Sequence, residues 1–364
     1  MNRKVRTAIV GCGKVAHLHA AALAELPEAQ FVAVTDAVFE RAGEFAARYR
    51  VRAYTDLQSL IAGSGVEAVI VCTPHPAHRA PAVRAAEAGV HVLVEKPLAA
   101  SLADCDAMIE AAARHRVKLG VVSQRRFFEP VARMKAAIDA GKLGAPALGT
   151  VAMFSWRDEN YYRSDPWRGK WDTEGGGVLI NQSPHHLDIL QWLMGPIDEI
   201  SAYHANLNHP YIEVEDTALA MIRFRGGALG SVVVSLSQKP GIYTKIHVHG
   251  ANGASVGAET DSGATFIAGM TAVAAPPLND LWTIPGEEAL LPAFQEQDRA
   301  TFRRIDPGTH YHVAQDRDFL RAVLEDRPAL VTGEDGRKVV EIVAAIYRSA
   351  KQRRPVRLPL EDGE

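Results

Sequence analysis

The chain has 364 residues, a formal net charge of −3 at pH 7 and 47% hydrophobic residues. At roughly 100–200 residues per domain, this length predicts two domains or one large domain, with a sizeable core in either case. The hydrophobic fraction, with 23% charged residues, is close to the globular average and excludes a disordered or fibrous protein. The near-neutral charge argues against nucleic acid and anionic membranes as partners, and no apolar run approaches the ~20 residues that span a bilayer. Three scattered cysteines and the lack of a signal-peptide pattern predict a soluble, cytoplasmic protein in a reducing compartment.

Short apolar strands alternate with helical stretches over the first third of the chain. We expect strands at residues 5–10, 31–35, 68–72, 91–94 and 118–122. We expect helices between them at residues 15–26, 40–49, 80–88 and 103–115. This alternation predicts right-handed βαβ crossovers, and strands that are apolar on both faces predict a parallel sheet covered by helices on both sides.

The pattern changes near residue 123, where we place a domain boundary between residues 1–123 and 124–364. One amphipathic helix is expected at residues 130–140, and helices near residues 312–325 and 336–351 close the chain. Between them lie β-type runs at residues 147–154, 199–207, 217–224, 228–237 and 245–249. The second half is therefore predicted to be an α/β domain with an antiparallel or mixed sheet, and the weakly periodic residues 257–300 are assigned no structure.

A glycine-rich motif follows the first strand. The stretch of G-x-G-x-x-A type supplies Gly11, Gly13, Lys14, Val15 and Ala16 as candidate cofactor-binding residues. Its glycines allow the backbone to approach a pyrophosphate, and the helix that follows points free N–H groups at it. The motif alone is weak, but its position between a strand and a helix predicts a Rossmann dinucleotide-binding domain.

An acidic residue predicts which dinucleotide binds. Asp36 closes the second strand 20 residues after Ala16, where a carboxylate accepts hydrogen bonds from the adenosine ribose. A carboxylate there repels a 2′-phosphate, so NAD is favoured over NADP. Arg41 lies close enough in sequence to keep NADP open.

The ends of two further strands carry polar residues that are expected to face the nucleotide, because ligands bind outside the carboxyl ends of parallel strands. Thr73, Pro74 and His78 follow one strand, and Glu95 and Lys96 follow the next. The alternative is a solvated turn and an exposed ion pair of little energetic value. Their shared position favours a functional role, above all for Lys96.

Aromatic and arginine side chains are concentrated in residues 155–172. Flat rings and guanidinium donors suit a polyhydroxylated ring, so Trp156, Arg163 and Arg168 are candidate substrate-binding residues, together with Arg125. The alternative is an interface between subunits, where the same residue types are common. The pairs His247/His249 and His310/His312 lack accompanying ligands at suitable spacing, and we expect no metal site.

Together these residues resemble the Gfo/Idh/MocA family, which includes glucose–fructose oxidoreductase and inositol dehydrogenases. Residues 175–188, which contain three glycines, two histidines and an aspartate, fit the same family, as do residues 318–320. The resemblance implies a Rossmann domain followed by an α/β domain with a large, mostly antiparallel open sheet. It also implies NAD(P)-dependent oxidation of a CH–OH group on a sugar or inositol. The aromatic segment is similar to that of anhydrosugar dehydrogenases of the levoglucosan type.

The resemblance assigns roles to three residues. Lys96 is expected to bind the reacting hydroxyl, and His185 to act as the acid/base. Asn181 stands where family members often carry aspartate; since an amide cannot take a proton, it is expected to orient the substrate or His185. His186 is the competing acid/base, and Asp188 is expected to accept a hydrogen bond from His185.

Two other readings of the site remain open. One is reduction of an imine, a biliverdin-like conjugated system or a keto-sugar with NADPH. The other is a non-catalytic NAD-binding sensor, which the presence of both Lys96 and His185 disfavours. Because a large open sheet exposes a flat surface, a homodimer or homotetramer is expected.

Overall fold

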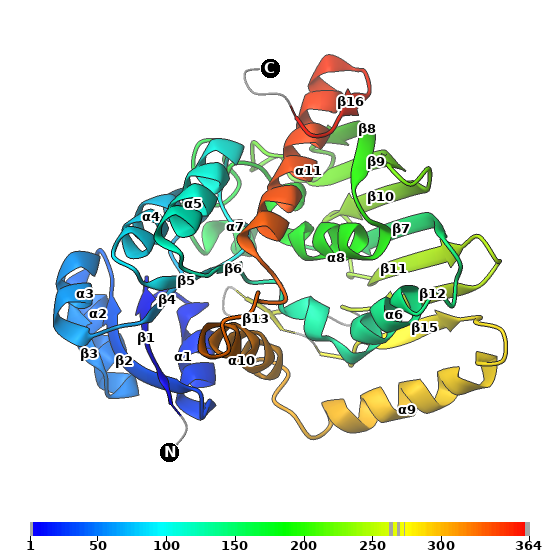
Figure 1. Cartoon of the computed structure of the whole chain (residues 1–364). Helices are drawn as coiled ribbons and strands as arrows, with labels where there is room; N and C mark the ends of the chain where they lie inside the picture. The colour runs from blue at the N-terminus through cyan, green and yellow to red at the C-terminus, as the bar shows by residue number, and fades with distance from the viewer. Residues whose placement is uncertain (1–2, 262–264, 268–269, 273, 361–364) are drawn as a thin grey trace. The chain divides into compact units, whose positions relative to one another are not determined.

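The computed structural model describes residues 3–261, 265–267, 270–272 and 274–360 (Figure 1). The chain divides into two units. The first combines Met1–Gln124 with Gly308–Val340, and the second combines Arg125–Pro307 with Glu341–Glu364. The domain boundary expected between residues 123 and 124 stays a prediction.

The first unit contains a six-stranded sheet in which every pairing is parallel. Its strands are β1 (Val5–Val10), β2 (Ala29–Thr35), β3 (Arg52–Tyr54), β4 (Ala68–Val71), β5 (His91–Val94) and β6 (Leu119–Val121). The order β3-β2-β1-β4-β5-β6 is that of the Rossmann fold. The doubly wound parallel sheet predicted from the sequence is therefore confirmed.

Helices cover this sheet, and all of them except α10 lie between its strands in the chain. They are α1 (Ala16–Glu25), α2 (Phe39–Tyr49), α3 (Leu57–Ser64), α4 (Arg79–Glu87), α5 (Leu102–His115) and α10 (His310–Leu324). Two of these elements were not predicted from the sequence: β3, which has three residues, and α3, which begins where Asp56 accepts the N–H of Ser59 at 2.8 Å. Helix α10 joins the core of this unit through Val313, Phe319 and Leu320, which pack with residues of β1 and α1.

The second unit is built on an eight-stranded sheet in the order β15-β12-β11-β7-β10-β9-β8-β16. Pairing is antiparallel except between β7 and β10, which confirms the mostly antiparallel sheet. The strands are β7 (Pro146–Phe154), β8 (Ile197–Ala205), β9 (Thr217–Phe224), β10 (Leu229–Ser235), β11 (Tyr243–Gly250), β12 (Ser255–Glu259), β15 (Leu278–Trp282) and β16 (Val356–Arg357). Strands β13 (Thr265–Ile267) and β14 (Met270–Ala272) pair with each other.

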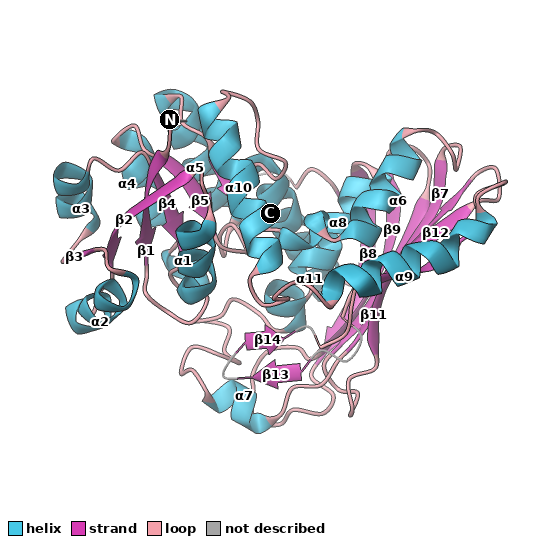
Figure 2. Ribbon diagram, turned by 90° about the horizontal axis from the view of Figure 1, so that it is seen from below, coloured by secondary structure: helices cyan, strands magenta, loops and turns pink. Residues whose placement is uncertain are grey.

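One face of the large sheet is covered by helices and the other is exposed. Along β9, buried residues such as Ile222 alternate with exposed residues such as Met221, as expected for a strand with one covered face. The covering helices are α6 (Glu129–Asp139), α8 (Pro184–Met194) and α9 (Leu291–Phe302), which contact β12, β7 and β15 respectively (Figure 2). The short helix α7 (Glu159–Arg163) belongs to the same unit, and α11 (Gly333–Gln352) runs from the first unit into the second.

The assignment of no structure to residues 257–300 is wrong. This stretch contains the end of β12, then β15, most of α9 and, within the described residues, β13 and β14. The sequence misleads because α9 has no apolar stripe: the residue it buries is Asp298, which forms an ion pair with Arg133 at 2.9 Å. No helix in the described ranges has both the length and the hydrophobicity needed to cross a membrane.

Candidate functional site

The glycine loop after β1 has the geometry of a phosphate-binding turn. Gly11 has φ +93°, and a Cβ there would lie 2.9 Å from the backbone of Cys72 and Thr73, so the position requires glycine. A Cβ on Gly13 would meet nothing within 4 Å, which leaves that side of the backbone open. Among the residues that the structure describes, no side chain caps the N terminus of α1 at Val15, where the helix dipole favours an anion. The loop therefore fits the pyrophosphate of a dinucleotide.

Asp36 lies directly beside this loop. Its carboxylate accepts the N–H of Cys12 at 2.7 Å and the N–H of Val38 at 2.8 Å, and Arg41 reaches it at 3.3 Å. The backbone thus holds a negative charge next to the phosphate-binding turn. Lys14, within the loop, is exposed.

His78 links two loops at the carboxyl end of the sheet. It is 0% exposed, its Nε2 lies 2.8 Å from the carbonyl oxygen of Thr73, and its Nδ1 lies 3.0 Å from that of Pro97. Because both ring nitrogens are occupied by backbone carbonyls, His78 positions the loops that carry Thr73 and Lys96. Pro74 precedes the 3₁₀ turn His75–Ala77 in the first of these loops.

Glu95 belongs to a buried cluster that the sequence did not reveal. His19 lies between two carboxylates: its Nε2 is 3.0 Å from Glu95, and its Nδ1 is 3.0 Å from Asp316. The other oxygen of Glu95 accepts the N–H of Lys96 at 3.0 Å. His19, Glu95 and His312 offer atoms that could bind a metal ion, all within 4.8 Å of one another. The alternative is a protonated His19, which the carboxylates of Glu95 and Asp316 would stabilise. These residues are far apart in sequence, so no local signal marks them.

Three glycines in the second unit form a tight turn before a short π-helix (Val178–Gln182). A Cβ on Gly176 would lie 2.1 Å from the hydroxyl of Tyr347, and one on Gly177 would lie 1.9 Å from the carbonyl oxygen of Glu215. The carboxylate of Glu215 accepts the N–H groups of Gly177 and Leu179, each at 3.0 Å. The glycines thus let the chain pass close enough for Glu215 to hold the start of the π-helix.

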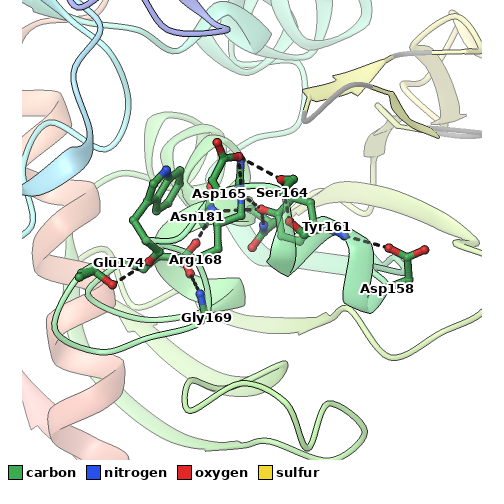
Figure 3. A network of polar contacts seen from close by, with 11 residues as sticks. Asp158, Tyr161, Ser164, Asp165, Arg168, Gly169, Glu174 and Asn181 are labelled. Atoms are coloured by element: carbon green, nitrogen blue, oxygen red, sulfur yellow. Dashed lines mark hydrogen bonds and ion pairs between the residues drawn. The ribbon is translucent and has the colours of Figure 1, made fainter. Parts of the chain in front are cut away.

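Asn181 lies on this π-helix, and His185 lies in the first turn of α8, which begins at Pro184. The Nδ2 of Asn181 donates to the hydroxyl of Tyr161 at 3.1 Å and to Glu174 at 2.5 Å. Arg168 donates to the same hydroxyl at 2.5 Å (Figure 3). Asn181 and Arg168, two of the predicted substrate-binding residues, are therefore joined through Tyr161. His185 is buried, with 6% of its surface exposed.

The neighbouring histidine and aspartate of α8 have other partners. His186 lies 2.7 Å from Nη1 of Arg125 and 3.2 Å from Asp261, and Arg125 also pairs with Asp261. Burial and the charge of Arg125 lower the pKa of His186. Asp188 accepts from Arg126 at 2.7 and 2.5 Å, so its expected hydrogen bond with His185 stays a prediction.

The remaining substrate candidates lie elsewhere in the second unit. Arg163 points into solvent with 73% of its side chain exposed and pairs with Glu159. Trp156 packs against His209, with ring centroids 5.3 Å apart. Sequence reasoning missed Glu174 and Tyr161. Tyr161 lies inside the aromatic segment, and Glu174 directly precedes the three glycines. Their positions next to these two motifs are the sequence signal that could have identified them.

Comparisons with known proteins agree with this architecture. Residues 5–123 match the oxidoreductase family with an NAD-binding Rossmann fold, and residues 131–256 match the GFO/IDH/MocA C-terminal domain. The scyllo-inositol 2-dehydrogenase (NAD(+)) of Bacillus subtilis is 32% identical over 70% of this chain and 73% of its own length. The myo-inositol 2-dehydrogenase of Thermotoga maritima is 28% identical over 97% of this chain and 98% of its own.

A solved structure extends the similarity to the whole fold. The WlbA dehydrogenase of Bordetella pertussis, in complex with NADH and UDP-GlcNAcA, superposes with a TM-score of 0.86 at 29% identity over 99% of both chains. The predicted NAD-binding domain and family resemblance are thus confirmed. The chain belongs to the Gfo/Idh/MocA family of NAD-binding oxidoreductases.

Proposed function

We propose that this protein oxidises a secondary hydroxyl of a sugar, anhydrosugar or inositol ring. The observation that carries the proposal is the joined set of Asn181, Tyr161 and Arg168 in a chain whose glycine loop fits a dinucleotide. An amide, a phenol and a guanidinium supply the directional hydrogen bonds that a polyhydroxylated ring requires. Two relatives are inositol dehydrogenases, and a third was solved with a nucleotide sugar, which supports a ring substrate.

The residues of this chain divide the chemistry between them. Lys96 donates a hydrogen bond to the reacting hydroxyl and stabilises the negative charge that develops on its oxygen. His185 takes the hydroxyl proton, because an imidazole with an unperturbed pKa near ~6.5 exchanges protons at neutral pH. Asn181 binds a ring hydroxyl and so orients the substrate. Bound NAD supplies the hydride acceptor.

NAD is the proposed cofactor in preference to NADP. The loop residues Gly11 to Ala16 hold the pyrophosphate, and Asp36 binds the adenosine ribose. The carboxylate of Asp36 is anchored by two backbone N–H groups, which keeps its negative charge in place against a 2′-phosphate.

We also propose that the protein is a homodimer or homotetramer formed through the exposed face of the large sheet. On this face Tyr203, Met221 and Leu229 are 71%, 65% and 53% exposed. The register places Tyr203 beside Leu219, and Leu229 beside Leu148, so these apolar side chains are neighbours across the strands. Exposed apolar side chains on a sheet face are stabilised by burial against a second copy.

The three cysteines support the proposed reducing, cytoplasmic location. Cys12, Cys72 and Cys105 are free and buried. Burial raises the pKa of the Cys12 and Cys105 thiols to about 12, so they stay protonated at neutral pH. Buried thiols of this kind suit a compartment where disulfides do not form.

Steady-state NADH formation with a panel of sugars, anhydrosugars, inositols and nucleotide sugar acids tests the main proposal. Turnover of one ring class with NAD is the expected result. Lys96→Ala and His185→Ala should each lower kcat by about 10²–10⁴-fold while NADH still binds, whereas His115→Ala, an exposed histidine, should change little. If either variant keeps near-normal turnover, its assigned role is wrong.

Other outcomes of the same panel point elsewhere. Turnover with NADP alone overturns the argument from Asp36 but leaves the dehydrogenase intact. Reduction of a keto-sugar or imine with NADPH, without alcohol oxidation, replaces the proposed direction. NADH binding with no turnover of any ring favours the sensor.

A further inference from the structure

Glu174 is a buried carboxylate that the proposed roles leave unused. It is 1% exposed and lies in the turn that leads into the three glycines. Its Oε2 accepts the N–H of Gly169 at 2.5 Å, and its Oε1 accepts from Nδ2 of Asn181 at 2.5 Å (Figure 3). Because burying a carboxylate is costly unless its oxygens accept hydrogen bonds, the amide of Asn181 helps to hold Glu174, and Glu174 in turn holds the amide.

Tyr161 and Glu174 differ in what they require of the Asn181 amide. The hydroxyl of Tyr161 also accepts from Arg168 and Gln182, and because a hydroxyl can donate as well as accept, its 3.1 Å contact does not fix which end of the amide faces it. An ionised carboxylate only accepts, so Glu174 requires the NH₂ end. The orientation of Asn181 therefore depends on Glu174 rather than on Tyr161.

Glu174 is placed to change its protonation state near neutral pH. Burial raises the pKa of Glu174 to about 7, against the lowering effects of the Gly169 N–H, the Asn181 amide and the charge of Arg168. The negative charge of Glu215 adds to the increase. A protonated Glu174 becomes a donor, and it then accommodates the oxygen end of the amide.

Among the ionisable side chains of this cluster, Glu174 is the one expected to titrate near neutral pH. The titratable and charged side chains around it are Arg168, Asp165, Glu215, Tyr161, Tyr162 and Tyr347. Arg168 pairs with Asp165 at 3.1 Å. Burial raises the pKa of each of the three phenols, Tyr161 to about 12, so they stay neutral.

Glu215 differs from Glu174 in the number of its donors. Burial raises the pKa of Glu215, but its oxygens accept the N–H groups of Gly177 and Leu179 and the hydroxyl of Tyr347 at 2.9 Å. These donors favour the carboxylate form of Glu215. Of the two neighbouring carboxyls, Glu174 is therefore the one that holds a proton first.

We propose that Glu174 is the positioning residue of the substrate-binding amide. As a carboxylate it accepts a hydrogen bond from Nδ2 of Asn181, and as a neutral acid its proton forms a hydrogen bond to Oδ1 of the reversed amide. Solvent supplies and receives that proton. The inference rests on the proposed function, in which Asn181 binds a ring hydroxyl. It places a carboxyl that can titrate in direct contact with Asn181, whose own side chain cannot ionise.

The first test is the pH dependence of KM compared with that of kcat. In the structure the carboxylate of Glu174 holds the amide of Asn181. As the pH falls from about 8.5 to about 6 and Glu174 is protonated, KM for the substrate should therefore rise at least threefold. Glu174→Gln should flatten this KM profile while the dependence of kcat on His185 remains. Glu213→Gln, which removes an exposed carboxylate from the same unit, should keep the wild-type profile. A Glu174→Gln profile that follows the wild type overturns the proposal.

The second test needs no substrate and so separates this inference from the proposed function. With ¹⁵N-labelled asparagine, the side-chain signal of Asn181 is identified by its loss in Asn181→Asp. In the wild type this signal should shift with a midpoint near pH 7, and in Glu174→Gln it should not shift. A signal that stays constant in the wild type overturns the inference even if the enzyme oxidises sugars.

A third variant, Glu174→Asp, tests the proposal if Glu174→Gln does not fold. Glu174→Asp keeps a carboxyl and should retain the titration of the Asn181 signal with a displaced midpoint. If Glu174→Asp folds and the signal no longer titrates, Glu174 has a packing role alone and the proposal is wrong.

Discussion

The Nε2 of His19 lies 3.0 Å from Oε1 of Glu95. His19 lies on α1, and Glu95 directly follows β5. Asp316 on α10 completes the contact from the other side of the ring. Although burial alone lowers the pKa of His19, the two carboxylates raise it to about 10. Despite burial, the hydrogen bond from His19 lowers the pKa of Glu95 to about 2. The residue that precedes Lys96 is thus held by a buried ion pair.

Replacing His19 should destabilise the protein in a pH-dependent way. Because the pKa of His19 is raised on folding, its stabilising contribution is fully present below about pH 6.5 and is lost as pH rises through about 10. His19→Gln leaves two buried carboxylates facing each other and should lower the free energy of unfolding by about 3–5 kcal/mol at pH 6. Urea unfolding at pH 6 and pH 9.5 measures both values.

The difference between wild type and His19→Gln should be smaller at the higher pH. A difference that is the same at both values contradicts a protonated His19. Substitution of His115, an exposed histidine at the end of α5, is the matched control and should leave unfolding unchanged.

Changing Asp36 should alter the choice of cofactor. Asp36→Asn removes the negative charge that repels a 2′-phosphate while keeping the shape of the side chain. Since about 1.4 kcal/mol corresponds to a tenfold change in an equilibrium, we expect the ratio of kcat/KM for NADP to that for NAD to rise at least tenfold. Arg41→Ala in the same background should reverse part of this gain, because Arg41 is the nearby cation. An unchanged ratio would mean that Asp36 does not select the cofactor.

The glycine before the π-helix should not tolerate a side chain. In Gly177→Ala the added Cβ would lie 1.9 Å from the carbonyl oxygen of Glu215, so the turn must shift. Overpacking of this kind costs about 1–3 kcal/mol, occasionally more, and thermal unfolding should show a clear decrease in Tm. At Gly226 a Cβ would meet nothing within 4 Å, and Gly226→Ala should change stability by less than about 0.5 kcal/mol. Equal effects of the two substitutions would refute the steric argument.

The exposed sheet face should control the oligomeric state. Met221 is 65% exposed and points out of the middle of β9, so Met221→Asp places a charge where a second copy would pack. Light scattering should show the dimer or tetramer for the wild type and a monomer for this variant. Leu290→Asp, which changes a 41% exposed leucine outside the strands of the sheet, should keep the wild-type mass. A wild type that is monomeric at micromolar concentration refutes the proposal directly.

The parts of this protein that the sequence predicts are those governed by local rules. The glycine loop could be recognised because the sharp turn before the helix requires glycine at Gly11, and Gly13 repeats the glycine at the spacing of the motif. The parallel sheet followed from short strands that are apolar on both faces, since only helices on both sides can cover them. The stretch containing α9 escaped prediction because that helix packs partly through the Arg133–Asp298 pair and shows no apolar period.

By itself, therefore, the sequence determined the fold class, the family and the dinucleotide loop, because each depends on neighbours along the chain. Tertiary structure alone decided which distant polar groups meet: His19 with Asp316, 297 positions apart, and Glu174 with Asn181 across the glycine turn. The physical reason is that a buried charge is stabilised by whatever group the fold brings within a few ångströms. Hydrophobic period and turn preference describe the path of the backbone, and they carry no information about that partner.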